Sequence, residues 1–183
     1  MIVRLTDAWT DVLQRRASNS ATGAYAAPVQ ELLGEMAAAG VLMQSNIKFN
    51  GALVLQVFGD GPVKVAVAEV QSDLSLRATA TVNGEVPPDA KLSQMVNVGG
   101  GGRCAITLDP KDRHPGQQPY QGVVPLHGDH HEKLERLSDV LQHYMLQSEQ
   151  LDTVLVLAGN SEVAAGLLIQ RMPLKSEGNL AQG

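Results

Sequence analysis

The chain has 183 residues and a formal net charge of −5, and 44% of its residues are hydrophobic whereas only 3% are aromatic. A chain of this length buries roughly 70% of its unfolded surface in one domain without needing disulfides or metals. Its 14 lysines and arginines are scattered, which argues against a nucleic-acid partner, because such proteins present a basic face and stacking aromatic residues.

Nothing in the sequence indicates a membrane span or an export signal. The apolar runs Leu53–Phe58 and Val154–Ala158 are far too short to cross a bilayer. Asp7 and Asp11 lie where a signal peptide has its apolar stretch. The single cysteine, Cys104, excludes an internal disulfide and a multi-cysteine zinc site. We therefore expect a cytoplasmic protein with no membrane partner.

Two helices are predicted near the N-terminus. Thr6 can cap a short helix over 7–16, with Asp7 in its first turn, where a carboxylate complements the helix dipole. A second helix is predicted over 27–44, with Pro28 at a tolerated early position. The second half of that helix is apolar nearly all round, which predicts that it is deeply buried.

Two successive β-hairpins are predicted over 47–70, with Asn50-Gly51 and residues 59–62 as their turns. An Asn-Gly pair between apolar runs favours a tight hairpin, because both central residues of a type I′ turn need positive φ. A half-buried strand follows at 74–82, where apolar residues alternate with serine, arginine and threonine.

In the C-terminal half, Asp129 and Glu132 have the spacing of a capping box and predict a helix over 129–146. Strands and helices occur in runs and do not alternate strictly, so the predicted class is α+β, with mostly antiparallel sheet packed against helices in a single compact core domain. The other predicted elements are a short helix at 89–96 and strands at 103–108, 120–126, 153–158 and 163–172, of which the last two pair.

One cluster has metal-ligand chemistry: His127, His130 and His131. A structural zinc site needs four ligands and a catalytic one at least three protein ligands, whereas Asp129 is already explained as a cap. We therefore interpret the cluster as a solvated helix entrance, with a metal-dependent hydrolase as the rival. Cys104 has no local histidine and is interpreted as a packing residue. No catalytic and no metal-binding residue is predicted.

Several segments share their residues and their order along the chain with one known family, and together they cover most of residues 28–173. The chain resembles the core domain of heat-shock protein 33, the redox-regulated 33 kDa chaperonin family. The matching pieces are IKFNG at 47–51, QVFGDGPVKVAV at 56–67, VNGE at 82–85, YQGVVPLHGD at 120–129, YMLQSEQL at 144–151 and AAGLLIQRMP at 164–173.

The resemblance implies an ATP-independent holdase that captures unfolding client proteins during oxidative stress and acts as a homodimer. In that family a linker and a C-terminal four-cysteine zinc module cover the binding surface until oxidation releases them. The sequence contains none of the four switch cysteines. We therefore expect a core domain at 1–173, the start of a linker or tail at 174–183, no cofactor in this chain and no redox switch, as in a truncated or naturally short relative.

A holdase needs an apolar surface, and strands with apolar residues on both faces can supply one. The candidate client-binding residues are Val54, Phe58, Ala66 and Ala68, assigned to one sheet face while the other face packs on helices. The alternative is that helices cover both faces. A non-catalytic interaction or oligomerisation module that has lost client binding is the rival function.

Overall fold

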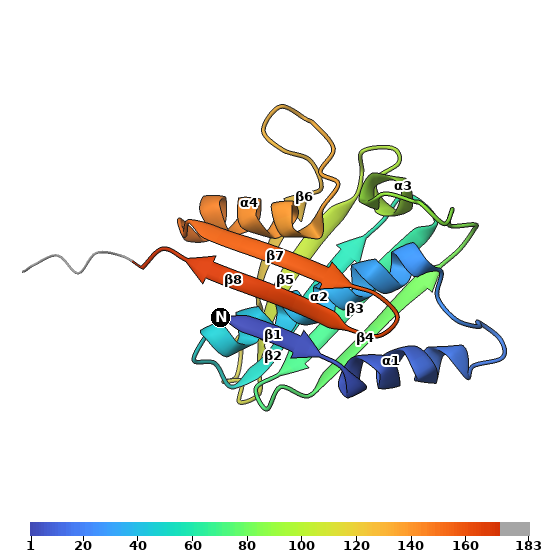
Figure 1. Cartoon of the computed structure of the whole chain (residues 1–183). Coiled ribbons are helices and arrows are strands. Elements are labelled where there is room, and N and C mark those ends of the chain that lie inside the picture. Colours follow the sequence, from blue (N-terminus) through green and yellow to red (C-terminus); the bar gives the residue numbers. More distant parts are fainter. Residues whose placement is uncertain (173–183) are drawn as a thin grey trace, which may run out of the picture.

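Helix α2 (Ala27–Asn46) lies at the centre of the molecule, between two β-sheets (Figure 1). The computed structural model describes residues 1–172, so the predicted linker or tail at 174–183 lies outside the described residues. The other elements are β1 (Ile2–Leu5), α1 (Asp7–Ala17), β2 (Gly51–Phe58), β3 (Val63–Gln71), β4 (Leu76–Val82), α3 (Leu92–Val96), β5 (Arg103–Pro110), β6 (Tyr120–Pro125), α4 (Leu137–Glu149), β7 (Thr153–Gly159) and β8 (Ala164–Gln170).

Every pair of neighbouring strands in the two sheets is antiparallel. The smaller sheet has the order β1-β8-β7, and the larger has the order β4-β3-β2-β5-β6. The α+β class with antiparallel sheets in a single domain is therefore confirmed, and so is the predicted pairing of the last two strands.

Helix α2 is buried because it packs closely on both sheets. Its residues 36–42 are all buried, as the apolar sequence predicts. A Cβ added at Gly34 would lie 3.2 Å from the Cα of Gly159 in β7, and one added at Gly40 would lie 2.9 Å from a methyl group of Val70 in β3. The two glycines thus let the backbone of one helix approach each sheet.

The N-terminal segment contributes a strand that periodicity does not predict. Strand β1 pairs with β8 and becomes an edge of the smaller sheet. Trp9 of α1 is fully buried, and its indole N–H donates to the carbonyl of Asn160 at 2.7 Å. This contact ties α1 to the β7–β8 turn.

The first predicted hairpin, at 47–51, is wrong. Helix α2 extends to Asn46, and residues 47–49 form no strand. Gly51 instead starts β2 and pairs with Pro110 of β5. A side chain there would collide with Phe49 and the carbonyl of Asp109, so Gly51 is used for close approach rather than for positive φ. The second hairpin, β2–β3, is confirmed.

The predicted helix over 129–146 begins only at Leu137. The carboxylate of Glu132 accepts the N–H of His130 at 2.9 Å, within a loop closed by a bridge between His127 and Lys133. His131 has a φ of 60°, which no right-handed helix contains. Glu132 therefore shapes a turn, and neither acidic residue caps a helix.

Candidate functional site

The larger sheet has one face packed on α2 and a second, mixed face that we call the open face. Phe58 is 42% exposed and Val123 is 52% exposed on it, whereas Val54, Val65 and Val67 are half-buried. For residues 1–172, the alternative that helices cover both faces is therefore wrong. The open face consists of Ala52, Val54, Gln56, Phe58, Val65, Val67, Glu69, Gln71, Arg77, Thr79, Thr81, Arg103, Ala105, Thr107, Asp109, Gln121, Val123 and Pro125.

The structure separates the four predicted client-binding residues. Val54 and Phe58 lie on the open face, but Ala66 and Ala68 are 0% and 1% exposed. Ala66 is directly opposite the buried Val57, and residues opposite each other on antiparallel strands share a face. The placement of the two alanines on the open face was therefore wrong, since they pack toward α2.

A β-bulge explains this error. The register of β3 against β4 shifts between Val63 and Val65, so Val63 and Ala66 are both buried although they are three positions apart. One extra residue in a strand exchanges the faces of everything that follows. Simple alternation from Val63 onward consequently assigns the wrong side to Ala66.

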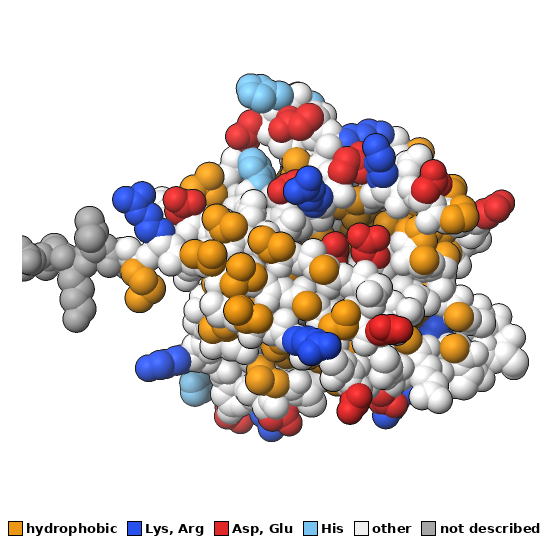
Figure 2. Space-filling view, in the orientation of Figure 1, with side chains coloured by type: hydrophobic (Ala, Val, Ile, Leu, Met, Phe, Trp, Pro, Cys, Tyr) orange, Lys and Arg blue, Asp and Glu red, His pale blue; other side chains and the backbone are white. Residues whose placement is uncertain are grey.

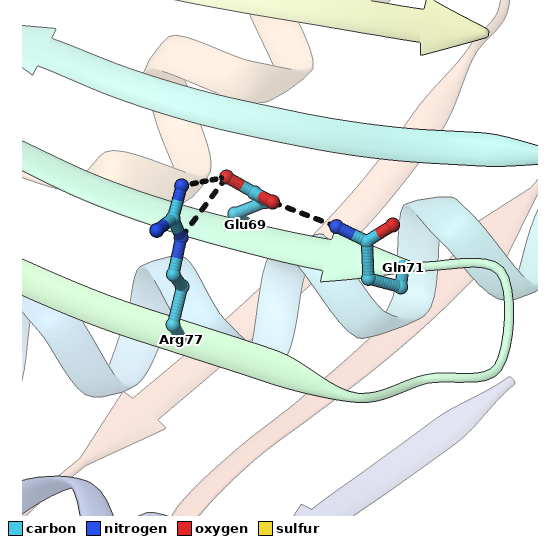
Figure 3. A network of polar contacts seen from close by, with 3 residues as sticks. All are labelled: Glu69, Gln71 and Arg77. Atoms are coloured by element: carbon cyan, nitrogen blue, oxygen red, sulfur yellow. Dashed lines mark hydrogen bonds and ion pairs between the residues drawn. The ribbon is translucent and has the colours of Figure 1, made fainter. Parts of the chain in front are cut away.

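Charged and amide groups occupy part of the open face. Glu69 accepts hydrogen bonds from both Nε and Nη2 of Arg77, at 3.1 and 2.6 Å, and from the amide of Gln71 at 2.7 Å (Figure 3). Glu69 and Arg77 are direct cross-strand partners. This network joins β3 to β4 and makes that part of the face polar.

The smaller sheet exposes a more uniformly apolar surface, which we call the outer face. Figure 2 shows hydrophobic side chains gathered over its strands. Val154 pairs with Ile169, and Val156, Leu167 and Ile2 form a row across all three strands. The outer face consists of Ile2 (78% exposed), Arg4, Val154 (50%), Val156 (55%), Ala158, Ala165, Leu167 and Ile169 (56%).

Sequence reasoning missed the outer face, although its signal was present. In 153–158, both alternating sets of residues are apolar: Val154 and Val156 on one side, Leu155 and Leu157 on the other. The same criterion had selected Leu53–Phe58. Strand β1 gave no such signal, because its periodicity does not predict a strand. The contribution of Ile2 to the outer face was therefore missed.

A cleft of about 680 Å³ adjoins the outer face along β7. Its wall includes residues 154–157 of β7, and its floor carries Glu31 and Glu35 of α2. Burial raises the pKa of Glu35 to about 7, and the negative charge of Glu31 adds to that rise. Glu35 therefore changes charge near neutral pH.

Two further groups that the sequence singled out are Cys104 and the histidine cluster at 127–131. Burial raises the pKa of the Cys104 thiol to about 12, and the thiol is fully buried. The rings of His127 and His131 lie edge to face at 5.4 Å, but residues 1–172 contain no group of three or more histidine, cysteine or acidic residues suited to a metal ion. Among those residues no helix is long and apolar enough to span a membrane.

Comparison with known proteins identifies relatives over nearly the whole chain. The model of the family described as Hsp33 protein matches residues 1–182. The chain is 45% identical over 173 residues to the 33 kDa chaperonin of Chromobacterium violaceum, which covers 94% of this chain and 52% of that protein. It is 41% identical over 173 residues to the 33 kDa chaperonin of Neisseria meningitidis, covering 93% and 51%.

The crystal structure of a 33 kDa chaperonin (heat shock protein 33 homolog) from Thermotoga maritima has a similar fold. It aligns with a TM-score of 0.68 at 20% identity, over 92% of this chain and 55% of that one. The chain thus spans about half the length of the curated relatives it matches.

Proposed function

The chain belongs to the Hsp33 protein family, and on that basis we propose that it is an ATP-independent holdase that binds unfolding proteins without catalysis. The observation that carries the proposal is the outer face, where Ile2, Val156 and Ile169 are each more than half exposed on one continuous sheet surface. Contiguous exposed apolar surface on a soluble scaffold marks a binding surface for other chains.

The physical requirements of a holdase fit such a surface. A client that is losing its structure exposes apolar side chains, and burying them is favourable by roughly 25 cal/mol per Å². A flat sheet face imposes no shape on the client, so many sequences bind weakly. We propose that Val54 and Phe58 of the open face form a second, smaller contact area, because both are apolar and accessible.

The zinc site that the family resemblance implies does not fit the residues present. The sequence has one cysteine, which is buried in the core, and a four-cysteine site cannot be assembled from it. We propose that this chain binds clients in the cytoplasm without a cofactor or redox switch, and that it forms a homodimer through its unpaired strand edges or apolar faces.

The test is light scattering from a thermally unfolding client enzyme, without ATP, under reducing and then oxidising conditions. Equal suppression of aggregation in both conditions is expected. A folded sample that suppresses nothing contradicts the holdase and favours a passive interaction module.

Threonine variants test the outer face. The triple variant Val154→Thr/Val156→Thr/Ile169→Thr keeps β-branched side chains but replaces a methyl group of each valine, and the ethyl group of the isoleucine, with a hydroxyl. If a bound client half-buries each side chain, each substitution loses roughly 0.4 kcal/mol of binding free energy. The three together lose about 1.2 kcal/mol, which is a five- to tenfold loss of affinity. The control is Val98→Thr, because Val98 is 55% exposed and belongs to neither face.

A further inference from the structure

Strand β7 is an edge strand of the smaller sheet, and the 680 Å³ cleft runs beside its unpaired edge. Val154, Leu155, Val156 and Leu157 all line this cleft. Residues of α2, of α4 and of the segment before and in α3 also line it. The cleft is therefore a slot bounded on one side by the backbone of a strand.

One backbone N–H at this edge is bound by a side chain rather than by another strand. The N–H of Leu155 donates to Oε1 of Gln142 at 2.7 Å, so it points away from β8. Because N–H groups two residues apart in a strand point the same way, that of Leu157 also faces the slot. Within residues 1–172 the N–H of Leu157 donates no hydrogen bond to a loop or a side chain. A rotatable glutamine is an acceptor that an incoming strand can displace.

Charge in the slot favours a cationic occupant. Four acidic and two basic side chains line it: Glu31, Glu35, Glu135, Asp139, Lys91 and Arg136. Glu135 is already engaged, because it accepts the N–H and hydroxyl of Ser93 at 3.0 and 2.6 Å. No ion pair within residues 1–172 neutralises Glu31, Glu35 or Asp139. The raised pKa of Glu35 arises first from burial and then from the negative charge of Glu31.

We propose that an extended polypeptide segment containing lysine or arginine adds as a strand to the unpaired edge of β7, where it displaces Gln142 from the N–H of Leu155. Alternate side chains of the added strand then extend the outer face, and the intervening cationic side chains reach down to Glu35 and Glu31. This inference rests on the proposed holdase function. It adds the place where client segments bind and the kind of segment that binds there. Strand addition supplies affinity through the backbone and selectivity through alternate side chains.

The first experiment uses fluorescein-labelled peptides and fluorescence anisotropy with the full chain. Three peptides share alternating valines and carry lysine, serine or glutamate between them. The lysine peptide is expected to bind at least fivefold more tightly than the serine peptide, which corresponds to one partly buried ion pair, and the glutamate peptide weakest. A lysine peptide with N-methyl groups on alternate amides, which removes backbone donors, is expected to lose its binding.

Two variants examine the slot itself. Glu35→Gln is expected to reduce the lysine preference to near that of serine, and Gln142→Ala to tighten binding because it frees the N–H of Leu155. The matched controls are Glu162→Gln, an exposed acidic residue in the β7–β8 turn, and Gln147→Ala on α4; neither lines the slot. Circular dichroism confirms that each variant is folded.

Changing pH provides an independent readout. From pH 6 to pH 8 the wild-type chain is expected to bind the lysine peptide more tightly as Glu35 ionises, and Glu35→Gln is expected to remove the part of this change due to Glu35. Glu31 on the same helix, and Lys91, Glu135, Arg136 and Asp139 on the facing elements, are present in both proteins. The comparison therefore isolates one carboxyl group.

Equal affinities for the lysine and glutamate peptides, or undiminished binding of the N-methylated peptide, overturn the inference. These results are distinguishable from failure of the holdase proposal. If the chain still suppresses aggregation of a client, the holdase stands and only the β7 slot is wrong. If it suppresses nothing, the holdase itself has failed.

Discussion

Replacing Glu35 with glutamine is expected to stabilise the folded chain at alkaline pH and to have little effect at acidic pH. Glu35 is a half-buried carboxyl group on α2 whose pKa is raised from 4.5 to about 7, first by burial and then by Glu31. The folded state therefore holds this proton more tightly than the unfolded chain. Glutamine resembles the protonated side chain and carries no charge at any pH.

The size of the effect follows from the difference in pKa. Between pH 4.5 and 7 the folded state binds more protons than the unfolded state, so the free energy of unfolding decreases as pH rises. Each pKa unit is worth about 1.4 kcal/mol, so the ionised carboxylate costs roughly 3 kcal/mol at pH 8 and close to nothing at pH 4. Glu35→Gln removes that cost.

The assay is urea unfolding of the wild type and of Glu35→Gln at pH 4, 6 and 8, followed by tryptophan fluorescence of Trp9. The difference in free energy of unfolding is expected to grow steadily from pH 4 to pH 8. Glu162→Gln, at an exposed position, serves as the control with no trend. A difference for Glu35→Gln that stays constant with pH would refute the reasoning, because it would show that the carboxyl titrates alike in both states.

Three further predictions concern the core and the open face. The Cys104 thiol, whose pKa burial raises to about 12, is expected to resist a disulfide reagent at pH 8 until the chain is unfolded; rapid reaction of the native protein contradicts this. Gly34→Ala, whose new Cβ lies 3.2 Å from the Trp9 ring, is expected to lower the free energy of unfolding by about 1–3 kcal/mol through overpacking despite the better helix propensity, which thermal denaturation measures. Glu69→Gln weakens the link to Arg77, itself largely exposed, and is expected to cost only about 0.5–1 kcal/mol in urea unfolding; a cost above 2 kcal/mol would show that the network does more than pair two strands.

The local features of the sequence determined much of the fold. The nearly all-apolar second half of α2 predicted a buried helix, and the turn at 59–62 predicted the β2–β3 hairpin, both of which the structure confirms. These features depend on neighbouring residues alone, so periodicity and turn chemistry reveal them. The matching segments also predicted the family, which the comparisons confirm.

Tertiary structure decided which surfaces remain available. The bulge after Val63 buries Ala66 and Ala68, and the pairing of β1 with β8 creates the row that ends in Ile2. The pKa of Glu35 is raised only because the fold buries this side chain beside Glu31, in the cleft that α4 and β7 also line. Periodicity shows that a strand has two faces, but strand register and the packing of distant helices determine which face is covered.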